Sequence, residues 1–177
     1  MISTRWLVIT GAPCCGKTTV LQELERLGFK CAYEAARLII DAQLAKGLTL
    51  LELHQDELSF QRSVVDAKSL VEQQLDAQEI VFLDRAMPDS ISYFKLKGLD
   101  PTPILPLSKK FRYERVFLFD RLPLEQDGAR IEDEQSASFL DKHLELDYRS
   151  LGYEVVRVPV MSIEERVATL LSYVEQS

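Results

Sequence analysis

The sequence contains no asparagine, and cysteine and histidine are scarce: there are three cysteines and two histidines among 177 residues. Three cysteines at positions 14, 15 and 31 offer neither a disulfide framework nor the paired spacing of a zinc site. The histidines at positions 54 and 143 lack a second ligand at metal spacing, so we expect ordinary surface or packing roles. The absence of asparagine excludes the Asn-Lys-x-Asp motif with which GTP-dependent switch proteins usually read guanine.

Long apolar runs and an excess of basic residues are also missing. No segment is apolar enough to span a bilayer, and the N-terminus lacks the pattern of a signal peptide, so we expect a cytoplasmic protein without membrane contacts. The formal net charge of -7 argues against general nucleic-acid binding. Hydrophobic residues make up 46% and charged residues 28% of the chain. This composition and length predict one globular domain over residues 1–177.

The most informative motif is the segment 11–18, which reads GAPCCGKT. It follows the apolar run Trp6–Ile9 and precedes a helical pattern over Thr19–Leu27. A glycine-bearing loop between a strand and a helix can turn its backbone N–H groups, and the positive end of the helix dipole, toward a phosphate chain. Lys17 would reach the β- and γ-phosphates, and the Thr18 hydroxyl would bind Mg²⁺. The residues expected to surround the phosphates are Gly11, Ala12, Pro13, Cys14, Cys15, Gly16, Lys17, Thr18 and Thr19.

Strand and helix patterns alternate along the chain. The predicted strands are Arg5–Thr10, Lys30–Tyr33, Glu79–Leu83, Arg115–Phe119 and Tyr153–Pro159. The predicted helices are Thr18–Leu27, Ala35–Lys46, His54–Gln78, Asp89–Lys97, Glu134–Leu151 and Ser162–Val174. Near-continuous apolar strands alternating with helices predict an α/β fold, a three-layer sandwich in which a parallel five-stranded sheet carries helices on both faces. The proline-rich segment Asp100–Pro106 is expected to be a loop, with or without a short helix after it.

Charged residues follow the second, third and fourth predicted strands, where ligands of such sheets bind. Asp84 ends an apolar run, as does the Mg²⁺-binding aspartate of phosphate-loop enzymes; a helix N-cap or an ion pair with Arg85 is the structural alternative. Arg85 suits a substrate phosphate or carboxylate, or merely pairs with Asp84. Glu34 would act as a general base, as an outer Mg²⁺ ligand or as a helix cap. Arg37 faces the same pocket or pairs with Glu34.

A charged segment, Asp120–Asp133, contains one proline, one glycine and few apolar residues. Its two arginines, Arg121 and Arg130, would neutralise charge on a triphosphate if the segment closed over the site. We therefore predict a lid over about residues 120–134; a solvated charged loop is the alternative.

Four motifs together resemble a known family. GAPCCGKTT at 11–19, YEAAR at 33–37, LDRAMPDSISY at 83–93 and DGARIED at 127–133 resemble the small AAA-domain ATPases. That group is similar to the nicotinamide-riboside kinase domain of bacterial NAD-regulator proteins and, more distantly, to thymidylate and deoxynucleoside kinases. The resemblance implies a nucleoside-kinase-like P-loop NTPase fold with a lid. It maps the acidic substrate residue to Glu34, the Asp-Arg pair beside substrate and metal to Asp84 and Arg85, and the lid arginine to Arg130.

Three functions fit this sequence. The first is transfer of the γ-phosphoryl group of Mg-ATP to a small hydroxylated, nucleoside-like acceptor. The others are a nucleotide-dependent switch or binding module, and a plain NTPase in which Glu34 orients water. A cavity of acceptor size beside Glu34 and Arg85 would favour the kinase, and a flat surface would favour the switch.

Overall fold

A five-stranded parallel sheet forms the middle of the molecule, with the strand order β3-β4-β2-β6-β7. The computed structural model describes residues 1–47, 49, 52, 55–122 and 134–174. The strands of this sheet are β2 (Trp6–Thr10), β3 (Lys30–Ala32), β4 (Val81–Asp84), β6 (Arg115–Phe119) and β7 (Val155–Val158). All four neighbouring pairs run parallel, so every strand ends at the same edge of the sheet. The predicted five-stranded parallel sheet is therefore confirmed.

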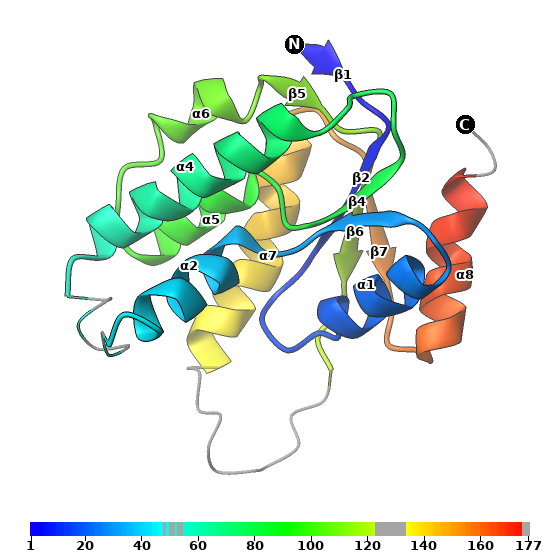
Figure 1. The fold of residues 1–177 in the computed structure, drawn as a ribbon, viewed down its shortest axis with the longest axis horizontal. Coiled ribbons are helices and arrows are strands. Elements are labelled where there is room, and N and C mark those ends of the chain that lie inside the picture. Colours follow the sequence, from blue (N-terminus) through cyan, green and yellow to red (C-terminus); the bar gives the residue numbers. More distant parts are fainter. Residues whose placement is uncertain (48, 50–51, 53–54, 123–133, 175–177) are drawn as a thin grey trace.

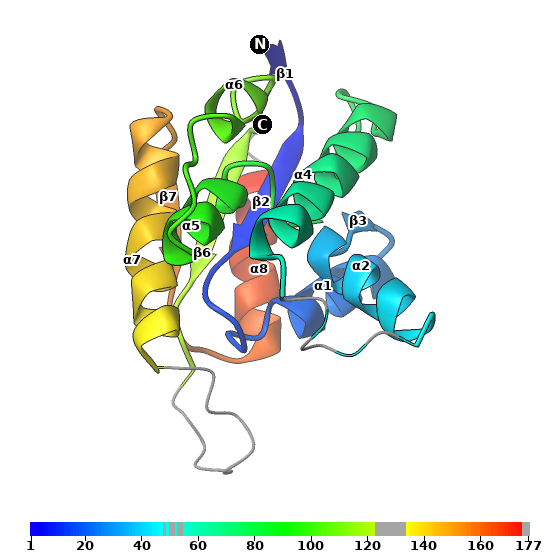
Figure 2. The same ribbon diagram turned by 90° about the vertical axis from the view of Figure 1, so that its left-hand side faces the viewer.

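Helices cover both faces of the sheet, as the alternating pattern predicted. The described helices are α1 (Lys17–Arg26), α2 (Ala35–Leu44), α4 (Glu57–Gln74), α5 (Asp89–Leu96), α6 (Ile104–Leu107), α7 (Glu134–Ser150) and α8 (Ile163–Val174). Helices α1 and α8 lie on one face, and α4, α5 and α7 lie on the other (Figures 1 and 2). Helix α2 packs beside α4. None of the helices in the described part of the chain combines the length and apolar character that a membrane crossing needs.

The central strand β2 shows why the sheet is a sandwich. All five of its residues are buried. Leu7 and Ile9 point into the core shared with α1 and α8, whereas Trp6 and Val8 point into the core shared with α7. Because successive side chains of a strand alternate between faces, an uninterrupted apolar run requires cover on both sides.

Some predicted boundaries were wrong. The long helix begins at Glu57, because Asp56 caps it through a bond from the Ser59 N–H, and it ends at Gln74, four residues before the predicted end. His54, the predicted start, lies outside the described residues. The proline-rich segment Asp100–Pro106 was expected to be a loop with or without a short helix after it; the short helix exists, but it begins within the segment, at Ile104.

A second, two-stranded parallel sheet was not predicted. It pairs β1 (Ile2–Ser3) with β5 (Phe111–Arg112) at the amino-terminal end of the main sheet (Figure 1). Two-residue strands have no hydrophobic period, so the sequence pattern gave no sign of them.

Candidate functional site

The segment between β2 and α1 forms a tight loop whose glycines are required by its geometry. Gly11 has φ +144°, and a Cβ there would lie 2.8 Å from the Phe119 carbonyl oxygen and 2.9 Å from the Cys15 Sγ. Gly16 has φ +85°, and Cys14 also adopts a positive φ of 60°. Positive φ values let a loop curl around a small anion, and only glycine adopts them at little cost. The predicted phosphate loop therefore has the backbone that its sequence motif implies.

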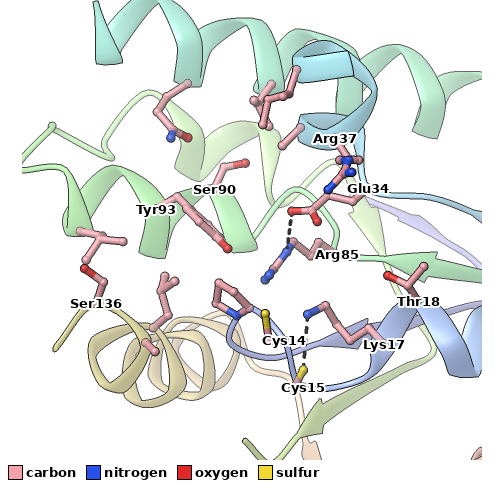
Figure 3. A pocket seen from close by; sticks show the side chains of 18 of the residues that line it. Cys14, Cys15, Lys17, Thr18, Glu34, Arg37, Arg85, Ser90, Tyr93 and Ser136 are labelled. Carbon is pink, nitrogen blue, oxygen red and sulfur yellow. Dashed lines mark hydrogen bonds and ion pairs between the residues drawn. The ribbon is translucent and has the colours of Figure 1, made fainter. Parts of the chain in front are cut away.

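The ammonium group of Lys17 lies folded over this loop. Its Nζ donates to the carbonyl oxygens of Gly11 at 3.3 Å and Ala12 at 3.1 Å, and it lies 3.4 Å from the Cys15 Sγ (Figure 3). Lys17 is buried, whereas Thr18 and Thr19 at the start of α1 are exposed. The cation and the two free hydroxyls thus border the space that the loop encloses.

Arg85 connects the loop to Glu34. It follows the last residue of β4 with a positive φ of 64°, and its side chain is only 3% exposed. Its Nε donates to Glu34 Oε1 at 2.8 Å (Figure 3), and its Nη1 donates to the Gly11 carbonyl at 2.8 Å. The guanidinium also lies 5.2 Å from the centre of the Tyr93 ring. One side chain thus joins residues that follow three neighbouring strands, β2, β3 and β4.

The environment of Glu34 keeps its carboxylate ionised. Burial alone would raise the pKa of Glu34, but the charges of Arg85, Lys17 and Lys68 and the hydrogen bond from Arg85 outweigh it, so the pKa is lowered. Glu34 occupies the N-cap position of α2, yet its side chain makes no capping hydrogen bond. Arg37, one turn later, pairs with Asp41 at 3.2 Å rather than with Glu34. The structure thus favours a role in the pocket for Glu34 over a role as a helix cap.

Asp84, the last residue of β4, has one carboxylate oxygen without a partner. The residue is 4% exposed, and its Oδ1 is buried with no hydrogen bond. Burial raises the pKa of Asp84 to about 6, and the charges of Lys17 and Arg85 partly oppose the rise. Pro88 occupies the N-cap of α5, and no ion pair among the described residues includes Asp84, so neither structural alternative applies. A buried carboxylate oxygen without a donor suits a cation.

A buried polar network behind the loop was not predicted from the sequence. Lys68 of α4 donates to the Ala86 carbonyl at 3.0 Å and to Ser90 Oγ at 3.1 Å, and burial lowers its pKa. Asp89 is fully buried and accepts bonds from the Thr10 hydroxyl and the Tyr148 hydroxyl, each at 2.5 Å. One signal was available: Lys68 follows the buried positions 60, 61, 64 and 65 at helical spacing, and so lies on the apolar stripe of its helix.

The phosphate loop opens into a cavity of about 740 Å³. Glu34, Arg37, Arg85, Lys68 and Tyr93 line it, together with apolar side chains of α2, α4, α5 and α7 (Figure 3). A volume of this size is that of a small-molecule pocket, as opposed to a flat surface.

Of the two predicted lid arginines, one lies among the described residues. Arg121 donates to Glu134 at 2.6 Å, at the start of α7. Arg130 lies outside the described residues, and so does most of the predicted lid segment. Among the described residues, no group of three or more His, Cys, Asp or Glu side chains is arranged to hold a metal ion. A magnesium ion at Asp84 and Thr18 would therefore need phosphate oxygens as further ligands.

Solved kinase structures share this fold. The deoxyadenosine kinase from M. mycoides, with products dCMP and dCDP, is 17% identical with a TM-score of 0.69, and the match covers 97% of this chain and 100% of that one. The thymidylate kinase from Ehrlichia chaffeensis is 15% identical with a TM-score of 0.70, covering 99% and 100%. The NadR protein in complex with NR is 17% identical with a TM-score of 0.71, covering 98% of this chain and 50% of NadR.

No curated protein matches this sequence. The model of the AAA domain family matches residues 6–166, which include the phosphate loop, Glu34, Asp84 and Arg85. Since this match covers most of the chain, and the fold is that of nucleoside and nucleotide kinases, the chain belongs to the AAA domain family and is a nucleoside-kinase-like P-loop NTPase.

Proposed function

We propose that this protein transfers the γ-phosphoryl group of Mg-ATP to a small hydroxylated, nucleoside-like acceptor. The observation that carries the proposal is that one cavity of about 740 Å³ is lined both by the phosphate loop and by Glu34 and Arg85. Beyond the loop, the cavity reaches Glu34, Arg85 and Tyr93, which leaves room for an acceptor beside the phosphates; a switch or a plain NTPase needs only the nucleotide part of the cavity. The kinase folds of the solved relatives support the same function.

On the nucleotide side, the proposal assigns the phosphate chain to the loop amides of residues 11–19. Lys17 leaves the carbonyls of Gly11 and Ala12, which it contacts in the free protein, and binds the β- and γ-phosphates. Thr18 and the unpartnered oxygen of Asp84 would hold Mg²⁺, which would supply positive charge to neutralise the phosphates. Arg121, and Arg130 from the predicted lid, add positive charge over the triphosphate.

On the acceptor side, Glu34 accepts the hydrogen bond of the attacking hydroxyl. Because its pKa is lowered, Glu34 is an ionised, weakly basic carboxylate at neutral pH and chiefly orients the hydroxyl, taking the proton as the new bond forms. Arg85 fixes Glu34 relative to the loop through its bonds to Glu34 and Gly11, and its cavity-lining face, beside Tyr93, contacts the acceptor. Phosphoryl transfer needs mainly such positioning and charge stabilisation.

The test is to follow ATP consumption with Mg²⁺, first alone and then with a panel of nucleosides, nucleoside monophosphates and nicotinamide riboside. ADP and the new phosphorylated product are measured together. We expect a rate that depends on one class of acceptor, with ADP and phosphorylated product formed in equal amounts. ADP formation that no acceptor accelerates, accompanied by free phosphate, would instead establish an NTPase. Nucleotide binding without turnover would point to the switch.

A further inference from the structure

Arg166 reaches from the last helix to the phosphate loop. It lies in the first turn of α8, is 3% exposed, and its Nη1 donates to the Cys15 carbonyl at 2.6 Å. Its guanidinium also lies 4.8 Å from the centre of the Phe119 ring, at the end of β6. The contact joins residues 151 positions apart, and neither the motif nor the helical pattern predicted it.

The charge of Arg166 is not balanced by any acidic partner in the described part of the chain. Its Nε and Nη2 are buried and make no hydrogen bond, and none of the ion pairs found there includes it. Burying a cation with unsatisfied donors costs stability, so such a group is expected where function requires it. Beside an anion-binding loop, an unbalanced cation raises the positive potential of the site.

The bond to Cys15 fixes the direction of a functional N–H group. In a trans peptide the carbonyl and the following N–H point in opposite directions. By holding the Cys15 carbonyl on the α8 side, Arg166 turns the Gly16 N–H away from α8. Arg166 also packs tightly against Gly16, because a Cβ at Gly16 would lie 3.0 Å from Arg166 Nη1.

We propose that Arg166 is a positioning residue of the nucleotide site, which orients the Cys15–Gly16 peptide for the β-phosphate of ADP or ATP and adds positive charge to the loop. This inference rests on the proposed nucleotide binding. Two arginines then hold the loop: Arg85 binds the Gly11 carbonyl at its start, and Arg166 binds the Cys15 carbonyl near its end.

The experiment compares Arg166→Met and Arg166→Lys with a matched control, Arg112→Met. Arg112 has the same kind of contacts, since it donates to the carbonyls of Leu151 and Gly152 and lies 4.0 Å from the Tyr153 ring, but it belongs to β5 at the opposite end of the sheet. Calorimetry gives the Kd of Mg-ADP and Mg-ATP for each variant, and thermal unfolding reports folding. Should Arg166→Met fail to fold, Arg166→Gln, which keeps a neutral donor, replaces it in the same comparison.

We expect Arg166→Met to weaken Mg-ADP and Mg-ATP by about the same factor, tenfold or more, because both carry a β-phosphate. Arg166→Lys should restore most of the affinity, and Arg112→Met should bind both nucleotides as the wild type does. Wild-type affinity in a folded Arg166→Met protein, or equal losses in Arg166→Met and Arg112→Met, would overturn the inference alone. If the wild-type protein binds neither nucleotide, the proposed function fails first.

Discussion

Three cations hold backbone carbonyls of the phosphate loop in the free protein: Lys17 contacts those of Gly11 and Ala12, Arg85 that of Gly11, and Arg166 that of Cys15. The motif predicted the first of these side chains, and strand-end logic predicted the second. Arg166 stands in an ordinary amphipathic helix pattern, and its contact depends on how α8 docks against the loop. Motifs and strand ends therefore predict residues that lie beside the loop, whereas a contact such as that of Arg166 emerges only from tertiary packing.

Replacing Lys17 by methionine removes the only charged side chain of the motif, the one expected to contact the phosphates. We expect Lys17→Met to weaken Mg-ATP binding by about 2–4 kcal/mol, the scale of a lost charge-assisted contact. Calorimetry with Lys30→Met, an exposed lysine on the edge strand β3, provides the control. Unchanged ATP affinity in Lys17→Met would refute the phosphate-loop assignment.

Glu34→Gln keeps the shape of the side chain but removes its charge and basicity. We expect the variant to bind Mg-ATP normally and to lose at least about a hundredfold in the rate of transfer, the scale of general-base catalysis. Steady-state rates with the acceptor found in the panel, together with calorimetry for ATP, separate the two effects. Normal turnover by this variant would remove Glu34 from the mechanism.

The raised pKa of Asp84 gives the free protein a defined pH dependence. Because the pKa is about 6 in the folded protein and 3.8 ordinarily, the folded state favours the protonated form, and the cost of the buried charge appears as the pH rises from 4 through 6. We expect Asp84→Asn to be more stable than the wild type at pH 7–8, by up to about 3 kcal/mol.

Urea unfolding of the nucleotide-free wild type and of Asp84→Asn, at pH values from 4 to 8, measures this difference. The advantage of the variant should shrink as the pH falls from 6 toward 4. A difference that does not change with pH would mean that the Asp84 carboxylate keeps an ordinary pKa.

At the scale of elements, the buried Asp89 joins three of them: its carboxylate accepts bonds from Thr10 at the end of β2 and from Tyr148 of α7, and it begins α5 itself. We expect Tyr148→Phe to lower the free energy of unfolding by about 1.5–3 kcal/mol, because a buried charged acceptor loses a donor. Tyr33→Phe removes a hydroxyl bonded to Glu25 at the surface and should change stability by less than about 1 kcal/mol. Chemical denaturation of the two variants makes the comparison.

Helices and strands were predicted best where buried apolar residues recur along the sequence. The apolar runs that became β2, β4 and β6 require cover on two faces, and their alternation with helical patterns indicated the sandwich. The ends of α4 were wrong because polar residues continue beyond the helix: Asp76 bonds the Gln78 N–H in a turn that helical periodicity does not distinguish from another turn of helix. The β1–β5 sheet was not predicted, because pairing between residues far apart in the sequence leaves no local pattern.

For the whole molecule, nucleotide binding should appear as a rise in thermal stability. A ligand at one hundred times its Kd stabilises the folded state by about 2.7 kcal/mol, which for a chain of this size corresponds to a Tm increase of about 5–10 °C. We expect Mg-ADP to produce such a shift in the wild type and a much smaller one in Lys17→Met. If the Tm of the wild type did not change at saturating Mg-ADP or Mg-ATP, this result would contradict nucleotide binding altogether.

The strand order also determines when the strands of the main sheet can pair while the chain is being synthesised. Strand β2 is the first strand of the main sheet to be synthesised, but its neighbours begin at Val81 and Arg115, and the arginine that binds its loop is residue 166. A nascent chain therefore carries the apolar segment 6–10 without its partners until most of the protein has left the ribosome. The phosphate loop, although encoded among the first eighteen residues, is completed only by the last helix. Chaperone capture of ribosome-bound chains that end before residue 115 is the expected cellular consequence.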